Sequence, residues 1–231
     1  MCAPEASLPS LSIIVAAYNE ELVIGPLLEQ LRSHHSGELI VADGGSQDRT
    51  AEIAAAFARV VEAPTGRAHQ YNHAVRHATG DVLLFLHADV RLSRQALTRL
   101  REVMQDEHVA GGNFNILFDG NDLTAAIFTR INRWRRYFGI FYGDSGIFVR
   151  RSYFEASGAF LPWPILEDYE FARRLWRTGA VALLDEPIYV SDRRWKKSGL
   201  IRTLWAWFWI QGLYLAGISP QRLARLYEAV R

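Results

Sequence analysis

The chain is poor in cysteine and in net charge. Cys2 is the only cysteine among 231 residues, which excludes an internal disulfide and a cysteine-based zinc site. The net charge is +1, so no global electrostatic field points to a nucleic-acid partner. Residues 1–10 have neither a basic start nor an apolar run, so we expect no signal peptide. These absences, with a length sufficient for one buried core, predict a compact cytoplasmic protein.

One strongly apolar segment, Leu204–Ile218, is rich in tryptophan and follows a group of basic residues. A membrane-spanning helix needs about 20 apolar residues, and this run is shorter and contains Gln211 and Gly212. Two interpretations stay open. The segment is either a helix lying at the inner face of the cell membrane, with tryptophans at headgroup level, or a helix packed on the sheet or in a homodimer.

The first half of the chain alternates apolar runs with amphipathic helical patterns. We expect strands at 11–17, 39–42, 60–61 and 82–86, and helices at 21–33, 50–58, 68–78 and 93–105. Ser93 fits the N-cap of the last of these helices. Alternation at this spacing predicts βαβ units, and therefore an α/β fold with a mostly parallel, Rossmann-like sheet flanked by helices.

The second half is less regular, and no linker separates it from the first. We expect strands at 109–118, 146–149 and 181–184, and helices at 121–137 and 168–177. The predicted organisation is a single domain over 1–231. It has a nucleotide-binding half at about 10–110, an acceptor and catalytic half at about 111–195, and a C-terminal, tryptophan-rich helical segment at 196–231.

Four short acidic signatures lie where a predicted strand ends or a predicted helix begins. They are Tyr18–Glu20, Asp43–Asp48, His87–Asp89 and Glu167–Asp168. The carboxyl ends of the strands form the ligand crevice of an open α/β sheet. Acidic side chains gathered at that edge suggest a bound cation and a base.

His87–Asp89 follows the most apolar of the predicted strands. A carboxylate such as that of Asp89, exposed at a strand tip, suits a hard divalent cation, Mn²⁺ or Mg²⁺, which would neutralise diphosphate oxygens. A nitrogen ligand from His87 would favour Mn²⁺. The alternative is that Asp89 caps a turn and His87 is a polar residue without a metal, and for His87 we prefer that alternative.

Asp43 is followed by two glycines and precedes a helix. Glycine permits positive φ and a close approach of backbone to ligand, and the Asp43 carboxylate can accept a hydrogen bond from a nucleobase ring N–H. An ordinary strand-to-helix turn, capped by Ser46 or Asp48, explains the same residues. The pattern alone does not separate the two.

Glu167 and Asp168 open a predicted helix, where carboxylates suit the helix dipole. One of the pair could instead be a general base that removes the proton of an acceptor hydroxyl. Asp144 lies in a loop between a helix and a strand, where it could bind an acceptor or shape the turn.

Three arginines could contact a phosphate or a base. Arg67 precedes a predicted helix, and Arg193 and Arg194 stand beside Trp195. Arginine suits bidentate phosphate contacts, although a solvated basic turn explains the latter pair equally well.

In this order the motifs resemble those of family 2 glycosyltransferases with the GT-A fold, and more narrowly the short bacterial branch of selenodomain-associated transferases. The resemblance covers about residues 10–195. It implies inverting transfer of a sugar from a nucleotide-diphosphate sugar, with a UDP-sugar favoured, to a hydroxyl of a sugar, lipid or small-molecule acceptor.

The resemblance also implies roles for individual residues. Asp168 would be the base with Glu167 supporting it, and Asp89 would bind the metal. Nucleotide-sugar contacts would come from the residues Ala17, Tyr18, Glu20, Asp43, Arg67, His87, Arg193 and Arg194.

The chain departs from the family pattern at two places that matter. His87 replaces the first acid of the D-x-D element, and Asp192–Trp195 differs from the Gln-x-x-Arg-Trp element of processive synthases. The first departure keeps open a catalytically silent nucleotide-sugar-binding protein at a membrane surface. A nucleotidyltransferase ranks last, because Ala16–Glu20 has neither glycine nor a basic residue.

Overall fold

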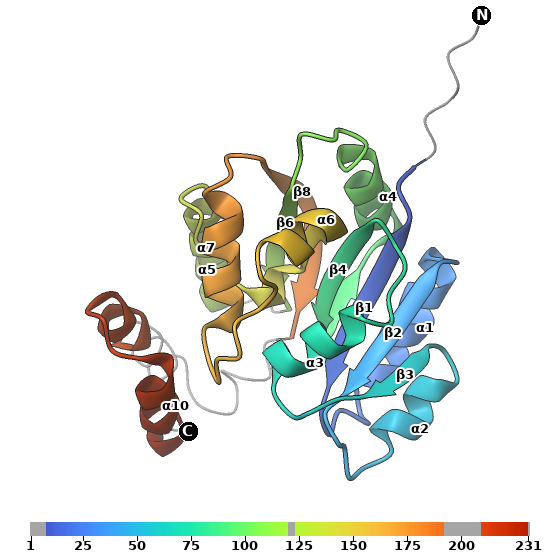
Figure 1. Ribbon diagram of the computed structural model, residues 1–231, viewed down its shortest axis with the longest axis horizontal. Coiled ribbons are helices and arrows are strands. Elements are labelled where there is room, and N and C mark those ends of the chain that lie inside the picture. The colour runs from blue at the N-terminus through green and yellow to red at the C-terminus, as the bar shows by residue number, and fades with distance from the viewer. Residues whose placement is uncertain (1–7, 120–122, 192–208, 231) are drawn as a thin grey trace, which may run out of the picture.

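The computed structural model describes residues 8–119, 123–191 and 209–230, and it is an α/β structure built on one central sheet (Figure 1). The sheet has eight strands in the order β3-β2-β1-β4-β7-β6-β8-β5. The strands are β1 Leu11–Ala17, β2 Glu38–Asp43, β3 Arg59–Glu62, β4 Val82–His87, β5 Val90–Leu92, β6 Gly111–Phe118, β7 Ile147–Arg150 and β8 Val181–Val190.

Helices cover both faces of the sheet, as predicted (Figure 1). They are α1 Ile24–His34, α2 Thr50–Ala55, α3 Arg67–Val75, α4 Arg94–Val103, α5 Leu123–Arg136, the 3₁₀ helix η1 Gly143–Ser145, α6 Arg151–Ala156, α7 Glu167–Trp176 and α10 Pro220–Val230. The Ser93 hydroxyl caps α4 by accepting a hydrogen bond from the Ala96 N–H at 3.1 Å, so the predicted N-cap is confirmed.

The parallel half of the sheet, β1 to β4, is the predicted Rossmann-like part. Strand β1 is buried along its whole length because its alternate side chains enter two different cores. Ile13 and Val15 join the core that contains α1 and α4, and Ile14 joins the core that contains α3 and α7. The continuous apolar run in the sequence is therefore the mark of a strand covered on both faces.

Beyond β4 the strand directions reverse. Strand β7 is antiparallel to both β4 and β6, whereas β8 is parallel to β6. This arrangement places η1, which precedes β7, next to the carboxyl end of β4. The start of α7 lies there as well, because Asp168 contacts Gly143 of η1.

The predicted boundaries in the second half were partly wrong. The late strand does not end at residue 184 but continues as β8 to Val190, through the polar Asp185 and Glu186. A register shift opposite Asn113 and Asn115 of β6 lets Pro187 pair without breaking the sheet. The short elements β5 and α6 were not predicted at all.

Candidate active site

The loops after β1 and β2 are joined to each other by side-chain hydrogen bonds. The Asn19 backbone N–H donates to Ser46 Oγ at 2.9 Å, and its side-chain Oδ1 accepts from the Gln47 N–H at 2.8 Å. Asn19 has φ 54°, a left-handed conformation that asparagine tolerates better than most residues. The Glu20 N–H donates to Thr50 Oγ1 at 2.7 Å. The Tyr18–Glu20 and Asp43–Asp48 signatures are thus joined by hydrogen bonds into one unit at the ends of β1 and β2, which we call the β1–β2 wall.

Asp43 holds its own turn together, as in the strand-to-helix turn considered from the sequence, but the N-cap residue of α2 is Arg49 and not Ser46 or Asp48. Its Oδ2 accepts from the backbone N–H groups of Gly45 and Ser46, and its Oδ1 accepts from the Ser46 hydroxyl. The side chain is buried at the end of β2. Contact between Asp43 and a nucleobase stays a prediction, and it would have to coexist with these three bonds.

Gln70 of α3 supports the β1–β2 wall by hydrogen bonds to its backbone, and the sequence did not indicate this role. Gln70 Nε2 donates to the carbonyl oxygens of Ala17 and Ala42, each at 2.8 Å, at the ends of β1 and β2. A Cβ on Gly44 would lie 3.1 Å from that amide nitrogen, so the glycine permits this close approach. No local pattern in the sequence indicates these contacts, because they join residues far apart in the chain.

The tip of β4 meets η1 at Gly143. A Cβ built on Gly143 would lie 2.9 Å from His87 Nε2 and 3.1 Å from Asp168 Oδ2. The imidazole at the D-x-D position and the predicted base therefore both lie against the same small residue. Asp89, two residues beyond His87, is partly exposed, and none of the described residues donates a hydrogen bond to its carboxylate.

Asp168 is held in place by two backbone donors. Its Oδ2 accepts from the Gly143 N–H at 2.8 Å, and its Oδ1 accepts from the Tyr169 N–H at 2.7 Å. The residue before the pair, Leu166, has φ 63°, a strained left-handed conformation for a leucine that turns the chain into α7. Asp168 as a whole residue is buried, with 8% of its surface exposed. These two bonds fix the orientation of the carboxylate.

Glu167 supports the site through an ion pair with Arg67. Arg67 Nε donates to Glu167 Oε1 at 2.7 Å, which joins the start of α3 to the start of α7. The Glu167 side chain is 2% exposed, and its Oε2 has no partner among the described residues. Burial raises the pKa of Glu167, Arg67 opposes this effect, and the neighbouring Asp168 adds to it. The predicted contact between Arg67 and a nucleotide stays a prediction.

The pKa of the buried Tyr71 hydroxyl is affected by several charged residues of the site. The hydroxyl donates to the Leu86 carbonyl at 3.0 Å, close to the tip of β4. Burial raises its pKa, Arg67 acts against this, and the carboxylates Glu167, Asp168 and Asp89 raise it further. Three of the predicted acids therefore act on the pKa of this one buried hydroxyl.

An aromatic cluster borders the site on the side of the C-terminal segment. The Tyr142 and Tyr169 rings stack with centroids 5.4 Å apart, and the Tyr214 ring lies edge-on to Tyr169 at 5.9 Å. The Tyr142 hydroxyl donates to Gln211 Oε1 at 2.9 Å. Residues 209–215 are helical. Gln211 and Tyr214 of this helix contact Tyr142 and Tyr169 at the border of the site.

The open question about the segment Leu204–Ile218 receives a partial answer. Its residues 204–208 lie outside the described residues, as do Arg193 and Arg194. From residue 209 onward, the helix packs against the aromatic cluster on its inner side, whereas Trp209 and Leu215 are exposed. No helix among the described residues is long and apolar enough to cross a membrane.

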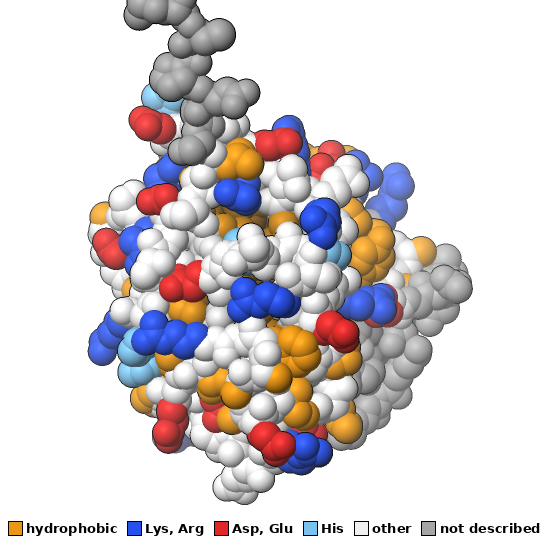
Figure 2. Space-filling view, turned by 90° about the vertical axis from the view of Figure 1, so that its right-hand side faces the viewer, with side chains coloured by type: hydrophobic (Ala, Val, Ile, Leu, Met, Phe, Trp, Pro, Cys, Tyr) orange, Lys and Arg blue, Asp and Glu red, His pale blue; other side chains and the backbone are white. Residues whose placement is uncertain are grey.

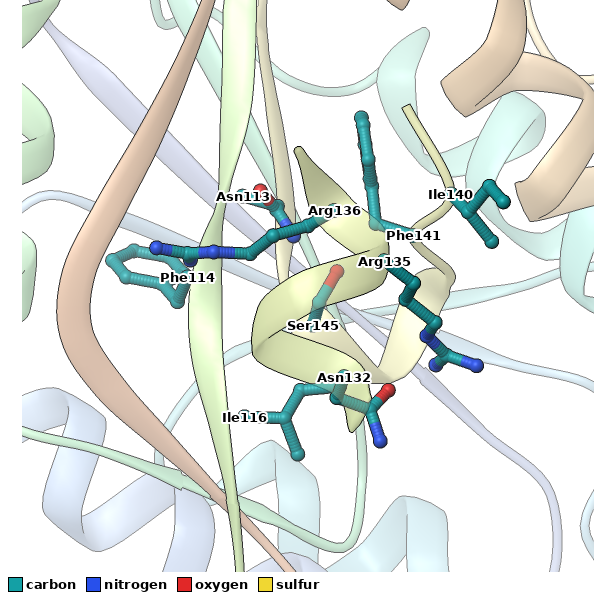
Figure 3. Close-up of a pocket in the computed structure, with 9 residues that line it drawn as sticks. All are labelled: Asn113, Phe114, Ile116, Asn132, Arg135, Arg136, Ile140, Phe141 and Ser145. Atoms are coloured by element: carbon teal, nitrogen blue, oxygen red, sulfur yellow. The ribbon is translucent and has the colours of Figure 1, made fainter. Parts of the chain in front are cut away.

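A small hollow of about 10 Å³ lies between β6 and α5 (Figure 3). In Figure 3 the side chains of Arg135 and Arg136 point in opposite directions from α5. Arg136 is buried and donates to the Leu184 carbonyl at 2.7 Å and to Asp185 Oδ1 at 3.1 Å. Arg135 instead covers the Tyr142 ring at 4.5 Å from its centroid. None of the predicted site residues lines the hollow. The bonds of Arg136 to Leu184 and Asp185 hold α5 against β8.

The remaining predicted residues are placed at the edge of this arrangement. Ala17 is buried at the end of β1, Tyr18 is 45% exposed and Glu20 is partly buried. Asp144 lies in η1 next to Gly143, whose backbone N–H donates to Asp168 Oδ2. We call this hydrogen-bonded contact between Gly143 and Asp168 the clasp. No group of three or more His, Cys, Asp or Glu side chains able to hold a metal occurs within the described ranges. A cation at Asp89 would therefore need oxygen ligands from its substrate.

The chain belongs to glycosyl transferase family 2, whose sequence model matches residues 12–158, well over half of the protein. A probable glycosyltransferase of Bacillus subtilis, YdaM, is 24% identical over 235 residues, which cover 86% of this chain and 55% of the relative. The chain spans about half the length of the curated relatives it matches. The narrower assignment to the selenodomain-associated branch stays a prediction.

Solved structures show that the fold is of the GT-A glycosyltransferase type. The mannosyltransferase PcManGT of Pyrobaculum calidifontis, solved with GDP-Man and Mn²⁺, has a TM-score of 0.69 at 21% identity and matches 97% of this chain and 70% of its own. Glucosyl-3-phosphoglycerate synthase of Mycobacterium tuberculosis, solved with Mn²⁺ and UDP, has a TM-score of 0.57 at 19% identity, with 81% and 76% covered. The predicted fold class is confirmed.

Proposed function

We propose that this protein transfers a sugar from a nucleotide-diphosphate sugar to a hydroxyl acceptor with inversion at the anomeric carbon. The observation that carries the proposal is the clasp at Gly143, which brings Asp168 beside the tip of β4. A base and a strand tip suited to a diphosphate thus share one small residue. The relatives named above are glycosyltransferases, and two structural neighbours bind UDP or GDP-mannose, which supports a nucleotide-sugar donor and favours no single base. A UDP-sugar remains our prediction.

Asp168 acts as the general base in this proposal. Its carboxylate accepts hydrogen bonds on both oxygens from backbone groups, yet each oxygen retains a further lone pair for an acceptor hydroxyl. As the hydroxyl attacks the anomeric carbon, its proton passes to Asp168 and the nucleoside diphosphate leaves from the opposite face. The transition state has oxocarbenium character, as in other glycosyl chemistry. Glu167 keeps Arg67 in place beside this carboxylate.

The residues at the tip of β4 fit a divalent cation, Mn²⁺ or Mg²⁺. Asp89 offers a partly exposed carboxylate, and His87 stands two residues before it, at the end of β4. A cation bound there supplies positive charge that stabilises the leaving diphosphate. Because His87 replaces an acid, the protein's share of the ligand set carries less negative charge than a pair of carboxylates, and we expect weak metal binding without the nucleotide.

Slow hydrolysis of the donor tests the proposal without knowledge of the acceptor. The purified chain is incubated with UDP- and GDP-sugars and Mn²⁺, and release of the nucleoside diphosphate is followed. We expect release with one class of donor, and we expect it to stop when the metal is chelated. A catalytically silent nucleotide-sugar-binding protein, which the histidine at position 87 favours, would bind donor and release nothing.

A further inference from the structure

Helix α5 presents an apolar face to solvent. Ile127, Ile131, Trp134 and Phe138 have exposed fractions of 48, 49, 62 and 69%. Each residue of an α-helix turns by about 100°, so the spacing of four and three residues places Ile127, Ile131 and Trp134 in one line on α5. We call these four residues the α5 stripe. Phe138 lies two residues beyond the helix end at Arg136, in the turn that follows.

The stripe cannot turn inward, because the opposite face of α5 is already fixed in the protein. Ala125, Phe128, Asn132 and Arg136 are buried there. The Phe128 ring packs edge-on against Phe118 of β6 at 6.0 Å. Arg136 is bonded to β8 as described above. Helix α5 is therefore apolar on two opposite sides, and only the inner side has a core to cover it. An exposed apolar line of this length marks a contact surface.

The charge around the α5 stripe has a single sign. The helix carries four arginines and no acidic residue. Arg130 is exposed and forms no salt bridge within the described ranges. Arg133 lies 3.7 Å from Asp185 Oδ1, which also pairs with Arg136. Another face of the molecule, that of Figure 2, instead mixes acidic and basic side chains. Basic residues that flank aromatic and aliphatic side chains on one helix are typical of a helix lying in a membrane interface.

We propose that the α5 stripe docks on the surface of an anionic lipid bilayer. Trp134, Phe138 and the isoleucines would enter the interface, and Arg130 and Arg133 would meet the lipid phosphates. The C-terminal end of α5 lies against the candidate active site, because Arg135 covers the Tyr142 ring. Docking along α5 would therefore bring the acceptor side of the site next to the bilayer. This surface is distinct from the segment Leu204–Ile218.

Vesicle flotation of the full chain tests the proposal without any donor or acceptor, so it can fail or succeed independently of the proposed transfer reaction. Vesicles of phosphatidylcholine alone are compared with an equal mixture of phosphatidylcholine and phosphatidylglycerol. We expect binding to the anionic vesicles, weakened by salt. Ile131→Ser with Trp134→Ser should lower the partition at least about tenfold. Arg130→Gln alone should lower it about fivefold.

The control variant is Leu22→Ser, which removes an exposed leucine far from α5 and should leave binding unchanged. All variants are compared by circular dichroism, and equal melting temperatures are expected because each changed side chain is exposed. The proposal is overturned if wild type ignores anionic vesicles. It is also overturned if Trp209→Ser and Leu215→Ser abolish binding while the stripe variant binds normally. Concentration-dependent dimerisation that the stripe variant loses would show instead that a second copy covers α5.

Discussion

Replacing Asp168 by asparagine is expected to lower turnover by about 10²–10⁴-fold, because a positioned general base contributes that much to a rate. Asparagine keeps the size of the side chain and can still accept a hydrogen bond from the Gly143 N–H, now 2.8 Å from Asp168 Oδ2. The clasp should therefore survive, and donor binding should stay as in wild type. The measurements are steady-state rates of nucleoside diphosphate release and the donor-induced change in melting temperature.

Glu170→Gln is the matched control on the same helix. Glu170 lies in the first turn of α7 but pairs with Arg174 at 2.8 Å, on a different side from Asp168. We expect this variant to retain turnover within a few-fold of wild type. If the Asp168 variant turned over as fast as the Glu170 variant, Asp168 would not be the base, and Glu167 would become the next candidate.

A single methyl group at Gly143 is expected to reduce turnover by about 10²-fold, since a misplacement of about 1 Å of a catalytic group has an effect of that size. The added Cβ would lie 2.9 Å from His87 Nε2 and 3.1 Å from Asp168 Oδ2. Both are the ends of side chains, so the fold can accommodate Gly143→Ala by moving them. Rates of donor hydrolysis and melting temperature, measured together, separate loss of geometry from loss of stability.

Gly212→Ala provides the control for this change. None of the described residues lies within 4 Å of a Cβ at Gly212, although this glycine is in the helical segment that borders the site. That variant should behave as wild type in both measurements. Full activity in Gly143→Ala would mean that the positions of His87 and Asp168 tolerate movement, which contradicts a catalytic clasp.

Much of the parallel half of the fold could be predicted, because its signals are local. The strand Leu11–Ala17 is apolar throughout, and each later strand is separated from it by an amphipathic helix. The acidic residues at strand ends were expected to gather at one edge of the sheet, and Asp89, Glu167 and Asp168 all raise the pKa of the same buried hydroxyl, that of Tyr71. Chain topology alone places such residues together, whatever their partners.

The contacts that give the site its shape could not be predicted from local patterns. Arg67 and Glu167 are 100 positions apart, and Tyr142 reaches Gln211 across 69. Gly143 has no distinguishing neighbourhood in the sequence, yet both His87 Nε2 and Asp168 Oδ2 lie within about 3 Å of where its Cβ would be. Side-chain pairing across elements depends on how those elements pack, and a single sequence does not contain that information in any short window.

The exposed side of α5 illustrates the same limit in another way. A helix was predicted at 121–137 and observed at Leu123–Arg136. Because apolar residues occur on two sides of it, the sequence did not indicate which side enters the core. Only the structure shows that Phe128 is buried and Trp134 is exposed.

The most direct test of the nucleotide-sugar site is the melting temperature of the protein with UDP, GDP, CDP or dTDP, each with and without Mn²⁺. A ligand present at about 100 times its Kd stabilises the native state by about 2.7 kcal/mol. We predict a Mn²⁺-dependent increase with one nucleotide, retained in Asp168→Asn and lost in Asp89→Ala. An unchanged melting temperature with all four nucleotides would contradict the account, because no donor pocket would then exist at the ends of β1, β2 and β4.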